Sequence, residues 1–101
     1  MPKMSNGMVG KYVIVRCHDA GVHAGILKSH AGRECLLSSA RRLWYWKPAS
    51  GAFLSGVAVY GLHESSKVGE PVTILLTEDC EIILCTKVSE KSIKEIKSYE
   101  H

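Results

Sequence analysis

Features that identify many common protein classes are missing from this chain of 101 residues. It has no run approaching the roughly 18 apolar residues that a membrane-spanning helix needs. Its first nine residues lack the apolar segment of a secretory signal peptide, so we expect a reducing compartment and free, mostly buried thiols. The four cysteines are Cys17, Cys35, Cys80 and Cys85. We therefore expect neither disulfide bonds nor a membrane partner.

Motifs of metal and catalytic sites are missing as well. The cysteines form no C-x-x-C pair, and Cys80 and Cys85 would point to opposite faces of an extended strand. No Walker lysine loop, G-x-S-x-G or H-E-x-x-H motif occurs. Residues 17–19, Cys-His-Asp, have the residue types of a nucleophilic site, but sequence neighbours rarely face one another. We expect no metal, no cofactor and no enzymatic activity. A nucleotide hydrolase with His18 or His23 as its base remains the alternative.

The net charge is small and aromatic residues are few, which narrows the class of partner. The net charge is +3 and the pI about 8.7, below the pI above about 9 with clustered Lys and Arg that is typical of nucleic-acid-binding domains. Only seven residues are aromatic, yet Trp44, Tyr45 and Trp46 are consecutive and follow Arg41 and Arg42. The composition permits an anionic partner without requiring one.

The hydropathy pattern predicts a flexible leader over residues 1–9 and one globular domain over residues 10–101. Runs of β-branched and apolar residues between turn formers predict strands at residues 11–17, 22–29, 33–38, 71–77 and 81–86. Ala31-Gly32 predicts the tight turn of a hairpin. Residues 39–46 alternate in a way that suits a further strand, which Pro48 would end.

Two segments predict helices. Residues 50–60 carry apolar side chains on one helical face, with Ser50 as N-cap and Gly61 just beyond the end, although two glycines lower the helix propensity. Residues 89–97 form an amphipathic closing helix, with Ser89 as cap. The fold class expected is α+β: a small, mainly antiparallel β-sheet or partly open barrel with one central and one C-terminal helix.

The best candidate binding segment runs from Arg41 to Lys47. Guanidinium groups match phosphate oxygens, and indole or phenol rings stack on planar bases. Arg41 and Arg42 would hold phosphate, while Trp44, Tyr45 and Trp46 would stack on a base or form a pocket wall. The competing interpretation is that the two tryptophans belong to the core.

Two further segments could complete this site. Gly21 and Gly25 permit close approach of the backbone to a ligand, and His18 or His23 could donate a hydrogen bond to an anion. An ordinary turn followed by a strand is the competing interpretation. Lys67, in a polar loop after two serines, could contact phosphate, or the loop could simply be solvated.

Three motifs resemble a family of small uncharacterised proteins encoded by tailed bacteriophages. They are "GVHAGIL" at residues 21–27, "ARRLWYW" at residues 40–46 and "LLTEDCEIILCT" at residues 75–86. The resemblance covers most of residues 11–90. The chain departs from it at residues 50–70, which are rich in glycine where the family has a leucine-bearing helix.

The resemblance implies an accessory protein that counters host defence in the cytoplasm of an infected bacterium. One class of such factors forms homo-oligomers that sequester a signalling nucleotide, such as a cyclic dinucleotide or an ADP-ribose derivative. Sequestration without cleavage is therefore the leading hypothesis. An inhibitor that binds a host defence enzyme and a weak single-strand nucleic-acid-binding module are the alternatives.

Overall fold

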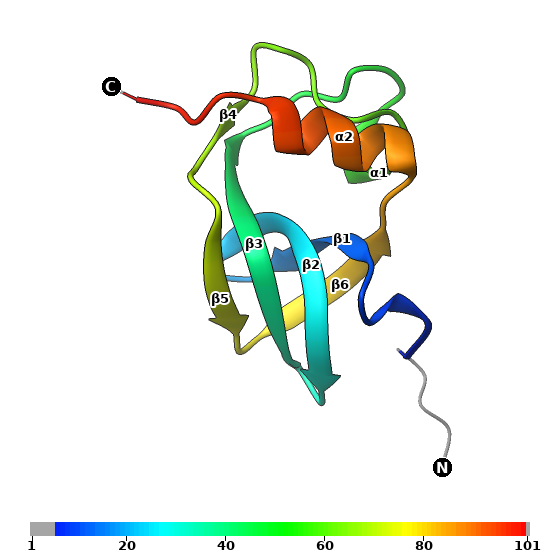
Figure 1. The fold of residues 1–101 in the computed structure, drawn as a ribbon, viewed down its shortest axis with the longest axis vertical. Helices are drawn as coiled ribbons and strands as arrows, with labels where there is room; N and C mark the ends of the chain where they lie inside the picture. Colours follow the sequence, from blue (N-terminus) through cyan, green and yellow to red (C-terminus); the bar gives the residue numbers. More distant parts are fainter. Residues whose placement is uncertain (1–5, 101) are drawn as a thin grey trace.

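The computed structural model of this protein describes residues 6–100, apart from the side chains of Asn6 and Cys80. It contains a mostly antiparallel six-stranded sheet and two helices, so the predicted α+β class is confirmed (Figure 1). Residues 1–5 of the predicted leader lie outside the described residues, and Asn6–Met8 form a 3₁₀ turn. The strands are β1 (Tyr12–Cys17), β2 (Gly21–Ala31), β3 (Glu34–Tyr45), β4 (Lys67–Val68), β5 (Val72–Leu76) and β6 (Asp79–Leu84). The helices are α1 (Phe53–Tyr60) and α2 (Lys87–Glu95).

The long strands β2 and β3 form the centre of the sheet. The hairpin predicted between them is confirmed: Ala31 pairs with Glu34, and Gly32 takes a φ of 59° in the turn. The two segments predicted around residue 39 are one strand, because a bulge with Ser39 at φ 51° bends β3 without ending it. The first half of β3 pairs with β5 and its second half with β4.

The strand order is β4-β3-β2-β1-β6, with β5 also on β3. Among the described residues the sheet stays open between β5 and β6, which leave their shared turn in different directions (Figure 1). Strand β1 is buried on both faces, and its alternate side chains enter two separate cores. One core lies between the sheet and both helices, around Ile14, Val57 and Ile93. The other is formed by the strands themselves, around Val15 and Leu37.

Both helices form where the sequence predicts them, but their caps differ. Helix α1 begins at Phe53, and neither Ser50 nor the N-cap Ala52 supplies a side-chain cap. Helix α2 begins at Lys87, and Thr86 caps it by accepting a hydrogen bond from the Ser89 amide at 3.1 Å. Predicting Ser89 as the cap was wrong because this fully buried hydroxyl donates to the Val57 carbonyl at 2.6 Å and joins the two helices.

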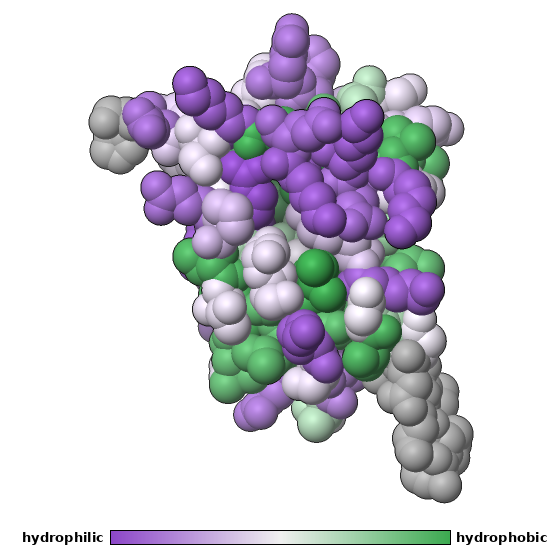
Figure 2. All heavy atoms as spheres, in the orientation of Figure 1, coloured by the Kyte–Doolittle hydropathy of each residue, from purple (hydrophilic) through white to green (hydrophobic). Residues whose placement is uncertain are grey.

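The surface is uneven in character. Figure 2 shows hydrophilic residues gathered over α2, whereas hydrophobic residues gather lower on the same face, over the sheet. On β5, Val72 and Leu75 are each more than half exposed. None of the helices in the described part of the chain is long and apolar enough to cross a membrane.

Candidate ligand-binding surface

The two arginines on β3 point to opposite faces of the sheet, as neighbours on a strand must. Arg41 is 4% exposed and enters the interior, whereas Arg42 is exposed. The sequence predicts that both guanidinium groups hold phosphate together. The structure separates them, so a site on this surface has Arg42 and lacks Arg41.

Arg41 instead joins the sheet to the end of α2. Its Nε donates to the Gly69 carbonyl at 2.9 Å, and its Nη1 donates to the carbonyls of Ile93 at 2.8 Å and Ile96 at 2.5 Å. Its Nη2 donates to Ser98 Oγ at 3.1 Å. Burial lowers the pKa of this guanidinium. A cation at a helix C-terminus also complements the helix dipole. Arg41 is thus a structural residue, and the prediction that it binds phosphate is corrected.

Arg42 and His23, paired across β2 and β3, share one acceptor. Arg42 Nη1 and His23 Nε2 each lie 2.9 Å from the Ala20 carbonyl oxygen. The imidazole is 1% exposed, and burial lowers its pKa, so the neutral ring donates through Nε2. The His23 donor that was predicted to bind a ligand therefore binds the Ala20 carbonyl and stabilises the β1–β2 turn.

The other residues predicted from this turn lie on its outer side. Gly21 has a φ of 86°, which favours glycine. The ring of His18 is exposed, and its Nδ1 lies 3.0 Å from Asp19 Oδ1. Arg42, on β3, also lines a hollow of about 250 Å³. The lining residues are His23, Arg42, Gly69, Glu70, Val72 and Ile74.

The aromatic run is divided between core and surface. Trp46 is half-buried and packs against the core beneath the helices. Trp44 is 64% exposed, and Tyr45 is about half exposed. The pairing of β3 with β4 shifts between Leu43 and Tyr45, so strict alternation is interrupted and the neighbours Trp44 and Tyr45 are both exposed. The question whether the tryptophans are core or surface therefore has a different answer for each.

Trp44 belongs to a group of exposed rings around one ammonium. Its ring stacks on that of Tyr99, with centroids 5.5 Å apart and planes at 24°. Lys67 Nζ lies 5.4 Å from the Trp44 ring centroid, 5.8 Å from that of Tyr45 and 5.1 Å from that of Tyr99. These distances are within cation–π range. We name Trp44, Tyr45, Lys67 and Tyr99 the aromatic–lysine cluster.

Long-range pairing brings the cluster together. Lys67 reaches the rings because β4 pairs Lys67 with Tyr45. Tyr99 reaches them because its amide donates to the Val68 carbonyl at 2.9 Å after α2 has ended. Sequence reasoning missed Tyr99. Its signal was weak: one aromatic residue in an otherwise polar tail.

Such a cluster can bind a planar, negatively charged molecule. Exposed indole and phenol faces stack on a base, and an ammonium above them favours an anion. Arg42, two residues before Trp44, is a second cation, exposed on β3. Among the residues that the structure describes, no three His, Cys, Asp or Glu side chains lie together so that they could hold a metal ion.

The sequence model of one family, described as a domain of unknown function (DUF6948), matches residues 10–93. The chain belongs to the DUF6948 family. No curated protein and no solved structure matches it significantly. The DUF6948 match contains Arg42, Trp44, Tyr45 and Lys67, whereas Tyr99 follows it. The surface therefore combines family-domain residues with one residue of the C-terminal tail.

Proposed function

We propose that this DUF6948 protein binds a phosphate-bearing signalling nucleotide at the aromatic–lysine cluster and sequesters it without cleaving it. The observation that supports the proposal most directly is the exposure of Trp44 beside Lys67. A tryptophan 64% exposed loses the stabilisation that burial of a large ring would give. A ligand that stacks on it would recover that stabilisation.

Each residue has a distinct part in the proposed complex. Trp44 stacks on the base, and Tyr45 and Tyr99 form the walls on either side of Lys67. Lys67 and Arg42 hold the phosphate, because the fork of a guanidinium fits phosphate oxygens. Stacking of one base contributes about 1–3 kcal/mol, and charged hydrogen bonds about 1.5–3 kcal/mol each.

The proposal includes a homo-oligomer. The hollow beside Arg42 has about 250 Å³, below the roughly 300–1,000 Å³ of most small-molecule sites, and no residue of the aromatic–lysine cluster lines it. A second subunit would enclose the ligand on the open side. The resemblance to phage proteins supports the biological part of the proposal, in which this anti-defence factor acts in the cytoplasm of an infected bacterium on a cyclic dinucleotide or an ADP-ribose derivative.

Calorimetric titration with cyclic dinucleotides and ADP-ribose derivatives tests this function. We expect at least one micromolar ligand, and Trp44→Ala to weaken its binding at least tenfold, in line with stacking of about 1–3 kcal/mol. Tyr60→Ala is the matched control, since Tyr60 is an aromatic residue about half exposed on α1. Chromatography of the ligand released by denaturation should recover it intact. Absence of any micromolar ligand would refute the proposal.

A second candidate function is inhibition of a host defence enzyme by direct binding. It is favoured by Phe53, which is 81% exposed at the start of α1 and has a φ of 61°. A non-glycine residue in this conformation costs about 1–3 kcal/mol, and such strain is concentrated at functional sites. If Phe53→Ser abolishes activity against host defence while Trp44→Ala does not, this candidate replaces the nucleotide proposal.

A further inference from the structure

Three strands lie at an edge of the sheet, and two of these edges are protected. In the part of the chain that the structure describes, β4 and β5 pair only with β3, and β6 pairs only with β1. The C-terminal tail lies against β4, because the Tyr99 amide donates to the Val68 carbonyl. Strand β6 carries Asp79 and Glu81, and charged side chains disfavour the addition of a further strand. Strand β5 has neither form of protection.

Strand β5 is uncharged and mostly apolar. No charged residue occurs between Glu70 and Glu78. Pro71 precedes the strand rather than interrupting it, and the bulge in its pairing with β3 lies on β3. Val72 and Leu75 are 51% and 56% exposed. Figure 2 shows hydrophobic residues at the lower left, where Figure 1 places β5. The charges, bulges and prolines that keep edge strands from pairing are thus missing within β5.

The outer edge of β5 also leaves backbone groups unpaired. In a strand with a partner on one side, every second residue directs its amide and carbonyl away from that partner. The described residues supply β5 with one partner strand, β3. Water can bind the remaining groups, but a second strand would bind them and also cover part of the Val72 and Leu75 side chains, which is favourable. The edge is thus a template for strand addition.

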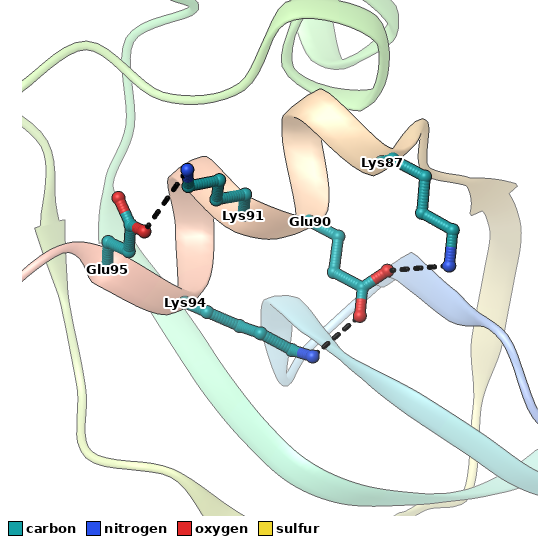
Figure 3. A pocket seen from close by; sticks show the side chains of 5 residues that line it. All are labelled: Lys87, Glu90, Lys91, Lys94 and Glu95. Carbon is teal, nitrogen blue, oxygen red and sulfur yellow. Dashed lines mark hydrogen bonds and ion pairs between the residues drawn. The ribbon is translucent and has the colours of Figure 1, made fainter.

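The charged face of α2 is a poor alternative for self-association. Its pocket of about 340 Å³ is lined by Lys87, Glu90, Lys91, Lys94 and Glu95 (Figure 3). Lys87 and Lys94 both pair with Glu90, at 3.9 Å and 2.6 Å, and Lys91 pairs with Glu95 at 4.0 Å. Lysine and glutamate are depleted from the cores of protein interfaces, because their charges are costly to bury. A contact between copies is therefore expected at the sheet edge rather than over this helix.

We propose that β5 is the dimer interface of this protein and pairs antiparallel with β5 of a second copy about a two-fold axis. A second copy fits this edge because it brings an equally neutral, apolar strand, whereas a charged peptide would find no opposite charge on β5. An axis perpendicular to the sheet keeps every side chain on its own face. Ile74 and Leu76 then continue the inner layer, and Thr73 and Leu75 of both copies meet on the outer face.

This interface rests on the strand itself and does not depend on the nucleotide proposal. It does supply the second subunit that the nucleotide site calls for. Val72 and Ile74 line the hollow beside Arg42, and a strand added about 4.8 Å beyond β5 would lie beside that hollow. The dimer is expected to form without any ligand, so its failure and the failure of nucleotide binding are measured separately.

Sedimentation equilibrium of the nucleotide-free full chain tests the proposal. We expect the mean mass to rise with concentration from 11.1 kDa towards twice that value. Two five-residue strands form a smaller contact than the roughly 1,200–2,000 Å² of stable complexes, so we expect a dissociation constant on the order of 10–100 µM. Leu75→Lys places a charge in the interface once per copy and should weaken the dimer at least tenfold, as should Thr73→Lys. Both positions are exposed, so both variants should keep the circular dichroism spectrum of the unaltered protein.

Leu84→Lys is the matched control, because Leu84 is a leucine 44% exposed on the other open edge, β6, and it should leave the dimer unchanged. Hydrogen exchange gives an independent readout: a higher protein concentration should slow exchange at the amides of β5 that face away from β3. A chain that stays monomeric up to about 1 mM overturns the proposal, as does equal self-association of Leu75→Lys and the unaltered protein. Growth beyond a dimer, or loss of the dimer in Leu84→Lys, also overturns it and indicates pairing of β5 with β6 of the next copy.

Discussion

Replacing Arg41 with methionine tests the central structural claim, because this one side chain joins the sheet to the end of α2. Methionine keeps much of the length and apolar character of the arginine stem but donates no hydrogen bond. The substitution therefore leaves the carbonyls of Gly69, Ile93 and Ile96, which now lie 2.5–2.9 Å from the guanidinium, without this donor.

The expected loss follows from these three bonds. Each hydrogen bond to a charged group contributes about 1.5–3 kcal/mol, but removing a buried charge also removes its desolvation penalty. We therefore expect the free energy of unfolding to fall by about 3–5 kcal/mol. That is a large part of the roughly 5–15 kcal/mol total of a domain of this size. The Tm should fall by about 12 °C or more.

Arg42→Met is the matched control, since the same substitution is made one residue along the same strand. Arg42 is exposed, and the described residues give its side chain one hydrogen bond, to the Ala20 carbonyl. Its loss should cost less than about 1.5 kcal/mol. Urea unfolding followed by circular dichroism measures both variants. Equal losses, or a loss below about 1 kcal/mol for Arg41→Met, would refute the structural role of Arg41.

Three more predictions concern single positions. Phe53→Gly should leave the free energy of unfolding unchanged or raise it by up to about 1 kcal/mol, because Phe53 is 81% exposed at a φ of 61°. In the same denaturant experiment, Leu54→Ala at the buried neighbouring position should lower the free energy of unfolding by about 2–5 kcal/mol. Gly25→Ala should lower the Tm, since its Cβ would lie 2.8 Å from the backbone of β3 and overpacking costs about 1–3 kcal/mol. Gly7→Ala should not, because a Cβ there would meet no atom within 4 Å in the part of the chain that the structure describes. The pKa of His23 is lowered from 6.5 on folding, so the unfolded chain binds more protons in acid, and stability should fall as the pH drops from neutral through 6.5. His23→Gln keeps a hydrogen-bond donor but does not titrate, so it should reduce that fall. If the variant has the same dependence of stability on pH as the unaltered protein, the buried neutral ring is contradicted.

The strands and helices were largely predictable because their signals are local. Alternation and β-branched runs predicted the strands, and Gly32 marked the hairpin turn. The helix caps were less predictable. Ser89 is a good cap residue by type, but it lies against α1, and its hydroxyl donates to the Val57 carbonyl. The division of β3 between two partners was also not visible, because a bulge at Ser39 has no clear sequence signal.

The binding surface was predictable only in part. The run that contains Trp44 and Tyr45 was identified from residue types, and Lys67 was named with it although it lies far along the chain. Which arginine remains available could not be predicted from two adjacent identical residues. Tyr99 could not be placed at all, because its position depends on the hydrogen bond to Val68 after α2.

The amino-acid sequence by itself determined the elements of this protein and the residue types it can offer to a ligand, because propensity and hydrophobic period act over a few neighbouring residues. Tertiary structure alone decided that Arg41 is interior and Arg42 exterior, that Trp46 packs while Trp44 stays exposed, and that Tyr99 and Lys67 meet beside it. The physical reason is that burial and hydrogen-bond partners at these positions are supplied by segments up to 57 residues away, such as the residues after α2 that contact Arg41.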